Sequence, residues 1–270
     1  MSISRPAPTA HWTQIRSATF ALCLLLPMVA LAELSNETIL GPGVISRPAY
    51  DGSNSQVLEF VPVVRYLGEP WFVRTTQDVL EAGAWMALAP GLHAGAQIAY
   101  EPGRKTSESQ FLESHDVPDV DRGASVGLQA EWDHMFGPMP VTLLVRLRQH
   151  TDLNRGAQID LRPSAGVFGA GPVSAGVYAQ VTWADAKSAD SLYGITPLES
   201  TVTGLPAFSA GSGWLFARFG LLASVDLSKE WAVVGSMESR RLFGDAAHSP
   251  LAECVSNHYA SVGLVYRFGK

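Results

Sequence analysis

Charged side chains in this sequence recur at every second position of several apolar segments. In residues 141–150, for example, Arg146 and Arg148 alternate with Val145 and Leu147. A period of two places such residues on one face of a β-strand, where opposite charges on neighbouring strands can pair. The same pattern in other segments predicts one interior network made up of Glu131, Asp133, Arg146, Arg148, Asp160, Arg162, Arg218, Glu238 and Arg240.

This predicted network has two interpretations. If the strands enclose a lumen, the charges could form a constriction that selects ions. Alternatively, they neutralise one another and form a plug that holds a small barrel shut. Together with Glu81, Asp226 and Arg65, the inward set holds six charges of each sign. Because such a set leaves little net field, we favour the plug.

Other combinations of reactive residues give weaker signals. Ser249 follows His248 in a Gly/Ala-rich segment, but a hydrolase needs a serine and a histidine that meet and a third group that orients them. Residues 113–121 hold four carboxylates and a histidine, which could bind a divalent cation that bridges lipopolysaccharide. This segment lacks the glycine and spacing of a calcium loop, so we interpret it as solvated. We predict no catalytic residue, no metal site and no cofactor.

The segments that must position these residues predict an all-β fold, a transmembrane antiparallel β-barrel of twelve strands. Short turns alternate with longer polar loops at 102–122, 185–212 and 243–257, which is typical of such barrels. A secreted β-sandwich is the alternative, but its two-sheet core would leave too many apolar faces uncovered. The predicted strands are 40–46, 57–66, 71–75, 79–88, 92–101, 124–133, 141–150, 157–167, 173–183, 213–226, 231–242 and 258–268.

The first 32 residues have the pattern of a secretory signal peptide. Basic residues precede an apolar run at 18–31, and Ala30-Leu31-Ala32 fits a cleavage site. We expect cleavage after Ala32, which leaves a barrel domain of residues 33–270 and changes the formal net charge from −6 to −8. This acidity argues against a nucleic-acid partner. The domain retains one cysteine, Cys254, so we expect no intrachain disulfide.

The final strand, 258–268, carries apolar side chains at every second position, ending with Leu264, Tyr266 and Phe268. An apolar face that ends in aromatic residues suits a strand that faces lipid. A terminal aromatic residue also resembles the signal by which bacterial outer-membrane proteins are recognised for insertion, although Gly269 and Lys270 follow it here. We therefore predict a location in the bacterial outer membrane, in contact with its lipid and lipopolysaccharide.

Several short segments follow one another in a fixed order along essentially the whole expected mature chain. They include Leu40-Gly-Pro-Gly-Val44, Asp119-Val-Asp121, Tyr193-Gly-Ile-Thr-Pro197, Arg241-Leu-Phe-Gly-Asp-Ala-Ala247 and Gly263-Leu-Val-Tyr-Arg-Phe268. In this order and spacing, the segments resemble the MltA-interacting protein family, MipA/OmpV.

The resemblance implies a non-enzymatic outer-membrane barrel. The best-known member is a scaffold that brings a murein-degrading lytic transglycosylase together with a murein synthase. These partners would meet the short turns and the lead at 33–39. Two alternatives are a pore, whose selectivity Glu131, Arg146, Arg148 and Asp160 would set, and a surface adhesin that acts through the three long loops.

Overall fold

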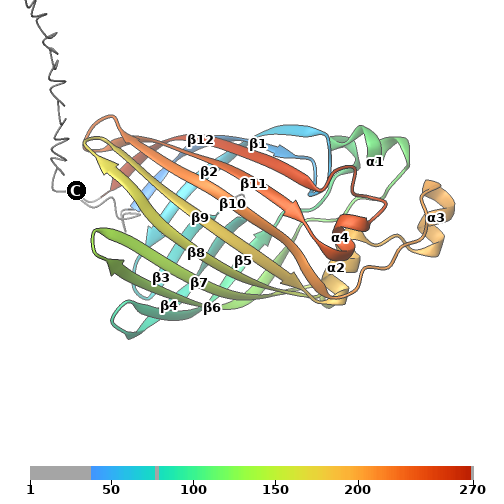
Figure 1. The fold of residues 1–270 in the computed structure, drawn as a ribbon, viewed down its shortest axis with the longest axis horizontal. Coiled ribbons are helices and arrows are strands. Elements are labelled where there is room, and N and C mark those ends of the chain that lie inside the picture. The colour runs from blue at the N-terminus through green and yellow to red at the C-terminus, as the bar shows by residue number, and fades with distance from the viewer. Residues whose placement is uncertain (1–37, 77–78, 269–270) are drawn as a thin grey trace, which may run out of the picture.

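Twelve antiparallel strands close into a barrel in the computed structural model of this chain, which describes residues 38–76 and 79–268 (Figure 1). Each strand pairs with its neighbours in sequence, and β1 pairs with β12 to close the barrel. The strands are β1 (Thr38–Pro48), β2 (Gln56–Leu67), β3 (Trp71–Thr76), β4 (Val79–Ala89), β5 (Leu92–Glu101), β6 (Gly123–Phe136), β7 (Met139–His150), β8 (Ala157–Ala170), β9 (Val173–Ala184), β10 (Gly213–Asp226), β11 (Trp231–Leu242) and β12 (Ser256–Phe268).

The prediction of twelve strands is confirmed, including the first strand, which its glycines and proline made the weakest. In β1, Pro42 is the register partner of Pro62 on β2. Both residues lack a backbone N–H, so the two missing donors fall at one place in the ladder. The predicted signal peptide and the residues after Phe268 lie outside the described residues.

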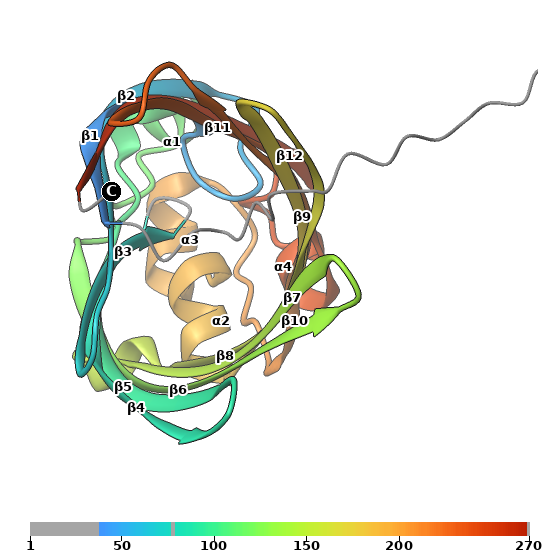
Figure 2. The same ribbon diagram turned by 90° about the vertical axis from the view of Figure 1, so that its left-hand side faces the viewer.

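The two ends of the barrel differ in their connections (Figures 1 and 2). Short turns and both described chain ends, Thr38 and Phe268, lie at one end, which we call the short-turn end. The three predicted long loops lie at the other end, and they contain helices that the sequence pattern did not predict. Among residues 38–76 and 79–268, none of the helices has the length and apolar character of a membrane span. The long loops hold η1 (Thr106–Glu108), α1 (Gln110–Ser114), α2 (Ala186–Tyr193), α3 (Pro197–Thr203) and α4 (Gly244–His248), and the shorter connection between β7 and β8 holds η2 (Leu153–Arg155).

The outer surface of the barrel is apolar. Leu58, Phe60 and Leu128 are all exposed, and aromatic side chains gather at the ends of the strands. The residues of the predicted insertion signal point outward at the short-turn end, where Trp231, Tyr266 and Phe268 make edge-to-face ring contacts; Leu264 is exposed beside them. A closed barrel with an apolar outer face and a polar interior is built for lipid, and this chain is an outer-membrane β-barrel.

The long loops pack into an apolar cap over the far end of the barrel. Leu112 of α1 is fully buried with Val117, Ile195 and Leu251. A second cluster joins Tyr193 of α2 to the ends of β9, β10 and β11 and to α4. Viewed from the short-turn end, α2 and α3 lie across the far mouth of the barrel (Figure 2). Residues of three loops that are far apart in sequence therefore form one packed unit, which we call the cap.

Candidate functional site: the charged interior

Twelve charged side chains of the described chain form a group across the middle of the barrel interior, which we call the belt. It holds six arginines and six carboxylates, so its formal charge is zero. Eight of the nine predicted network residues belong to it. The belt consists of Arg74, Arg146, Arg148, Arg162, Arg218, Arg240, Asp51, Glu81, Glu101, Glu131, Asp160 and Glu238.

Arg146 of β7 forms the centre of the belt. Its guanidinium lies 2.7 Å from an oxygen of Glu81 on β4 and 2.8 Å from an oxygen of Asp160 on β8. The pairing with Asp160 follows from strand register, because the two residues are direct partners in the β7–β8 ladder. All three side chains are buried. Charges this deeply buried require paired, hydrogen-bonded geometry, which this arrangement supplies.

Asp160 accepts several further contacts. Thr182 donates a hydrogen bond of 2.7 Å and Gln180 one of 3.0 Å to its second oxygen. Arg148 lies 3.2 Å from the first oxygen and also pairs with Glu101 at 2.8 Å. Every oxygen of this fully buried carboxylate thus has a partner, which fixes its position in the interior.

Arg74 of β3 extends the belt across the lumen. It contacts Glu81 at 2.7 Å and Glu131 of β6 at 2.8 Å, and it donates a third bond to Gln129. Arg74 was absent from the predicted network. The signal was present, since Phe72 and Arg74 share one face of a short strand whose other face carries Trp71. The strand was too short for its faces to be assigned from sequence.

The opposite wall holds a second set of contacts around Glu238 of β11. Arg240 lies 2.9 Å from this carboxylate and Arg218 lies 3.6 Å from it. Tyr178 on β9 also donates a 2.6 Å hydrogen bond to it, although β10 lies between the two strands. Gly220 makes this reach possible: it is the register partner of both residues, and a Cβ there would collide with the ring of Tyr178.

The loop 49–55 connects the belt to the cap. Its Asp51 pairs with Arg240 at 2.7 Å and accepts a hydrogen bond from Tyr259. In the same loop, Tyr50 donates to the carbonyl of Leu251 in the cap at 2.9 Å. Burial raises the pKa of the Tyr50 hydroxyl, and the nearby Glu253 raises it further, so Tyr50 remains a donor at neutral pH. Asp51 lies outside any strand, and no alternation indicated it.

Two cavities lie on either side of the belt. The first, about 380 Å³, extends toward the short-turn end, and its lining includes Leu67, His93 and Arg162. The second, about 250 Å³, lies below the cap, and its lining includes Arg104 and Tyr193. Tyr259 lines both cavities. The belt therefore separates the two halves of the interior with paired charges.

Two predicted network residues take different positions from the rest. Asp133 faces the first cavity but lies beyond the belt, where it accepts a hydrogen bond from Thr142 and lies 4.0 Å from His93. Arg162 faces the same cavity with no carboxylate within 4.0 Å among the described residues. Its guanidinium instead lies over the ring of Tyr178, 4.3 Å from the ring centre.

The reactive residues of the loops have structural roles. Ser249 donates to the carbonyl of Tyr193 at 2.7 Å, whereas the His248 ring contacts the carbonyl of Gly244. The two side chains are therefore not paired as a hydrolase would require. Asp119 accepts a bond from the backbone of Thr106, which lowers the pKa of its carboxyl. The described residues contain no group of three potential metal ligands.

Among solved structures, an outer membrane channel from Pseudomonas putida F1 matches with a TM-score of 0.48 and 11% identity, over 86% of this chain and 95% of that chain. The NanC porin matches with a TM-score of 0.40 and 5% identity, over 85% of this chain and 98% of the porin. No curated protein matches the sequence.

The family comparison covers nearly the whole barrel. The sequence profile described as MltA-interacting protein MipA matches residues 40–268, from the third residue of β1 to the last residue of β12. This match confirms the resemblance seen in the separate sequence segments. The chain belongs to the MltA-interacting protein family, MipA.

Proposed function

We propose that this barrel is a non-enzymatic scaffold that binds a lytic transglycosylase at the periplasmic side of the outer membrane. The observation that carries the proposal is the family match, because the family is described by its interaction with MltA, a lytic transglycosylase. The resemblance further suggests a murein synthase as a second partner, so that the barrel would hold a degrading and a synthesising enzyme together.

The interior geometry supports a scaffold over a pore. Arg146, Glu81 and Asp160 are buried and paired in the middle of the lumen, and the whole belt is neutral. An ion-selective constriction usually exposes a ring of charge of one sign to the permeating ion. Charges that satisfy each other do not offer such a ring. The surfaces that the barrel presents to partners are therefore its two ends.

The short-turn end is the proposed binding surface. Short turns of bacterial barrels face the periplasm, where murein lies. The turn between β10 and β11 presents an apolar side chain, Leu227, which is 60% exposed, next to the exposed Lys229. An exposed apolar residue near a charge offers a contact to a soluble partner, and its removal leaves the barrel interior untouched.

The test uses the mature barrel, refolded in detergent, and a purified lytic transglycosylase of the MltA type. We expect retention of the enzyme on immobilised barrel at salt well above physiological concentration. Leu227→Asn should weaken binding about tenfold, an effect of about 1.4 kcal/mol. The matched control is Leu198→Asn on α3, at the other end of the barrel, where the side chain is 75% exposed; it should leave binding unchanged.

Two results would overturn this proposal. One is a folded barrel, identified by its heat-shifted gel mobility, that retains neither murein enzyme. The other is a single-channel conductance typical of an open pore in planar bilayers, which would favour the pore instead. Leu198→Asn and Leu227→Asn localise the surface: binding that Leu198→Asn abolishes and Leu227→Asn spares would contradict the short-turn end as the binding surface.

A further inference from the structure

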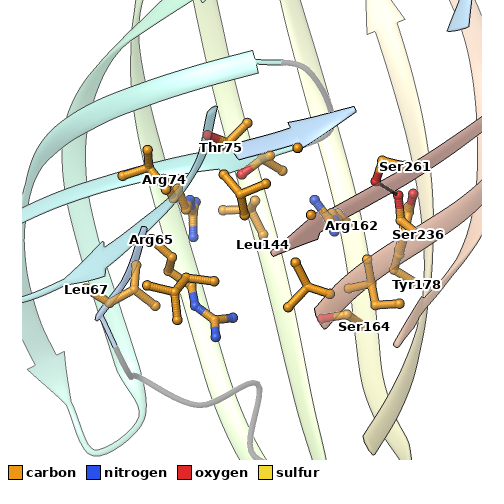
Figure 3. Close-up of a pocket in the computed structure, with 18 of the residues that line it drawn as sticks. Arg65, Leu67, Arg74, Thr75, Leu144, Arg162, Ser164, Tyr178, Ser236 and Ser261 are labelled. Carbon is orange, nitrogen blue, oxygen red and sulfur yellow. Dashed lines mark hydrogen bonds between the residues drawn. The ribbon is translucent and has the colours of Figure 1, made fainter. Parts of the chain in front are cut away.

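Arg162 is the one belt arginine without a carboxylate partner within 4.0 Å in the described part of the chain. Arg74, Arg146, Arg148, Arg218 and Arg240 each contact at least one carboxylate within that distance. Arg162 lies on β8 and faces the cavity on the short-turn side of the belt. Figure 3 shows it among the cavity residues, with Arg65 and Arg74 drawn on one side and Ser236 and Ser261 on the other.

Three other arginines of the belt lie near enough to Arg162 to act on its charge. The charged side chains that act on its guanidinium include Arg218, Arg74 and Arg146, all of which repel it. Its close neighbour is the ring of Tyr178, and the hydroxyl of that tyrosine is already committed to Glu238. A cation–π contact offsets only part of the cost of removing a guanidinium from water. The site therefore holds a positive charge, and the carboxylates that balance it in the neutral belt do not contact it.

The carboxylates that line the same cavity are engaged by other groups. Glu131 pairs with Arg74 at 2.8 Å, and Glu238 pairs with Arg240 at 2.9 Å. Glu69 and Asp133 lie near His93 toward the short-turn end, at 3.6 Å and 4.0 Å from its ring nitrogens. None of these four groups makes an ion pair with Arg162.

The remaining polar lining includes Arg65 and several hydroxyl residues, which can donate hydrogen bonds to an anion. The hydroxyls of Ser164, Ser236 and Ser261 line the cavity, and those of Ser236 and Ser261 lie 2.7 Å apart. A hydroxyl can turn its hydrogen toward an incoming oxygen, and a guanidinium presents a planar fork that fits a carboxylate or a phosphate. The cavity volume of about 380 Å³ falls within the range of small-molecule sites.

We propose that this cavity binds a small solute through an oxyanion group, a carboxylate or a phosphate, and that Arg162 is the residue that pairs with it. The site is independent of the scaffold proposal, since it lies inside the barrel and needs no protein partner. It also gives a role to Arg162, the belt charge that ion pairing among the described residues leaves over.

The test is calorimetric titration of the refolded mature barrel with succinate and, separately, with inorganic phosphate, each against sodium chloride of equal ionic strength. We expect saturable binding of at least one anion. Arg162→Gln, which keeps hydrogen-bonding atoms but removes the charge, should weaken it at least about tenfold. The matched control is Arg122→Gln, a change of an exposed arginine in a loop, which should leave the affinity unchanged.

The two anions separate the possible sources. Binding of succinate alone assigns carboxylate solutes, binding of phosphate alone assigns phosphorylated ones, and binding of both assigns oxyanions in general. As a second measurement that needs no variant, the bound anion should raise the thermal midpoint of the wild-type barrel in a concentration-dependent way, which glycerol should not do. Absence of saturable binding to both anions, or equal affinity in Arg162→Gln, overturns the proposal.

Discussion

The belt and the cap hold together by opposite means. In the belt, the fully buried groups are charged, and Arg146, Glu81 and Asp160 are stabilised by ion pairs and hydrogen bonds. In the cap, the fully buried groups include Leu112 and Leu251, which pack against apolar neighbours. The same chain thus has a polar centre inside the membrane and an apolar centre outside it.

The reason lies in what each region must face. The barrel strands turn their apolar side chains toward lipid, and strict alternation then leaves polar side chains for the interior. At the level of the belt the interior gains little from hydrophobic burial and is ordered by paired charges, whereas an apolar cluster of Ile39, Ala232 and Val265 packs on the barrel strands nearer the short-turn end. The loops lie in water, where burial of apolar surface stabilises a packed unit as it does in a soluble protein. Damage to the belt should therefore destabilise the whole barrel, whereas damage to the cap should stay local.

The largest expected effect comes from Arg146→Met. This change keeps a similar side-chain length but leaves Glu81 and Asp160 buried with one partner fewer. Loss of one member of a buried ion pair costs about 4 kcal/mol. We expect the free energy of unfolding of the barrel in lipid vesicles, measured by urea titration with tryptophan fluorescence, to fall by that amount.

The control for this measurement is Arg241→Met on β11, where the arginine is exposed. A surface change of this kind should alter stability by no more than about 0.5 kcal/mol. Equal losses in the two variants would mean that the belt contributes no more than a surface residue, and the contrast between belt and cap would fail.

The next effect is that of Leu112→Ala in the cap. Leu112 is fully buried against Val117, Ile195 and Leu251, and its truncation should cost about 3 kcal/mol of local packing. We expect protease added from outside to cleave the loops much faster, while the urea midpoint of the barrel remains unchanged. Leu198→Ala, an exposed position on α3, should change neither quantity. A drop in the barrel midpoint with Leu112→Ala would show that the two regions unfold together.

Alternation along the sequence predicts much of the belt, because successive residues of a barrel strand point alternately to the interior and to the outside. Arg146 and Asp160 were expected inside, and their pairing follows from adjacent positions in neighbouring strands. The contact between Arg146 and Glu81 joins β7 to β4, which lie apart in the sheet. That contact depends on the curvature of the closed barrel, which no local pattern specifies.

Alternation along the sequence predicted neither the cap nor the contacts that connect the cap to the belt. The loop helices are short, and the buried residues of the loops, such as Leu112 and Ile195, come from segments without a clear period. Their burial results from contacts between loops that are far apart in sequence. Asp51 belongs to the same category, since it reaches Arg240 from a loop outside the strands whose alternation predicts an inward face.

The smallest effect tests how precisely the belt is fitted. Gly220→Ala introduces a Cβ that collides with the ring of Tyr178, so the ring must move away from Glu238. Because an extra group is forced into a packed site, the free energy of unfolding should fall by about 2 kcal/mol. Gly213→Ala is the matched control, because a Cβ there meets no atom within 4 Å. If the loss arises from the ring, Gly220→Ala should cost almost nothing in a Tyr178→Ala background. If Gly220→Ala lowers the free energy of unfolding equally in the Tyr178→Ala background, the effect comes from the strand itself. The belt would then tolerate looser packing than the contacts around Glu238 suggest.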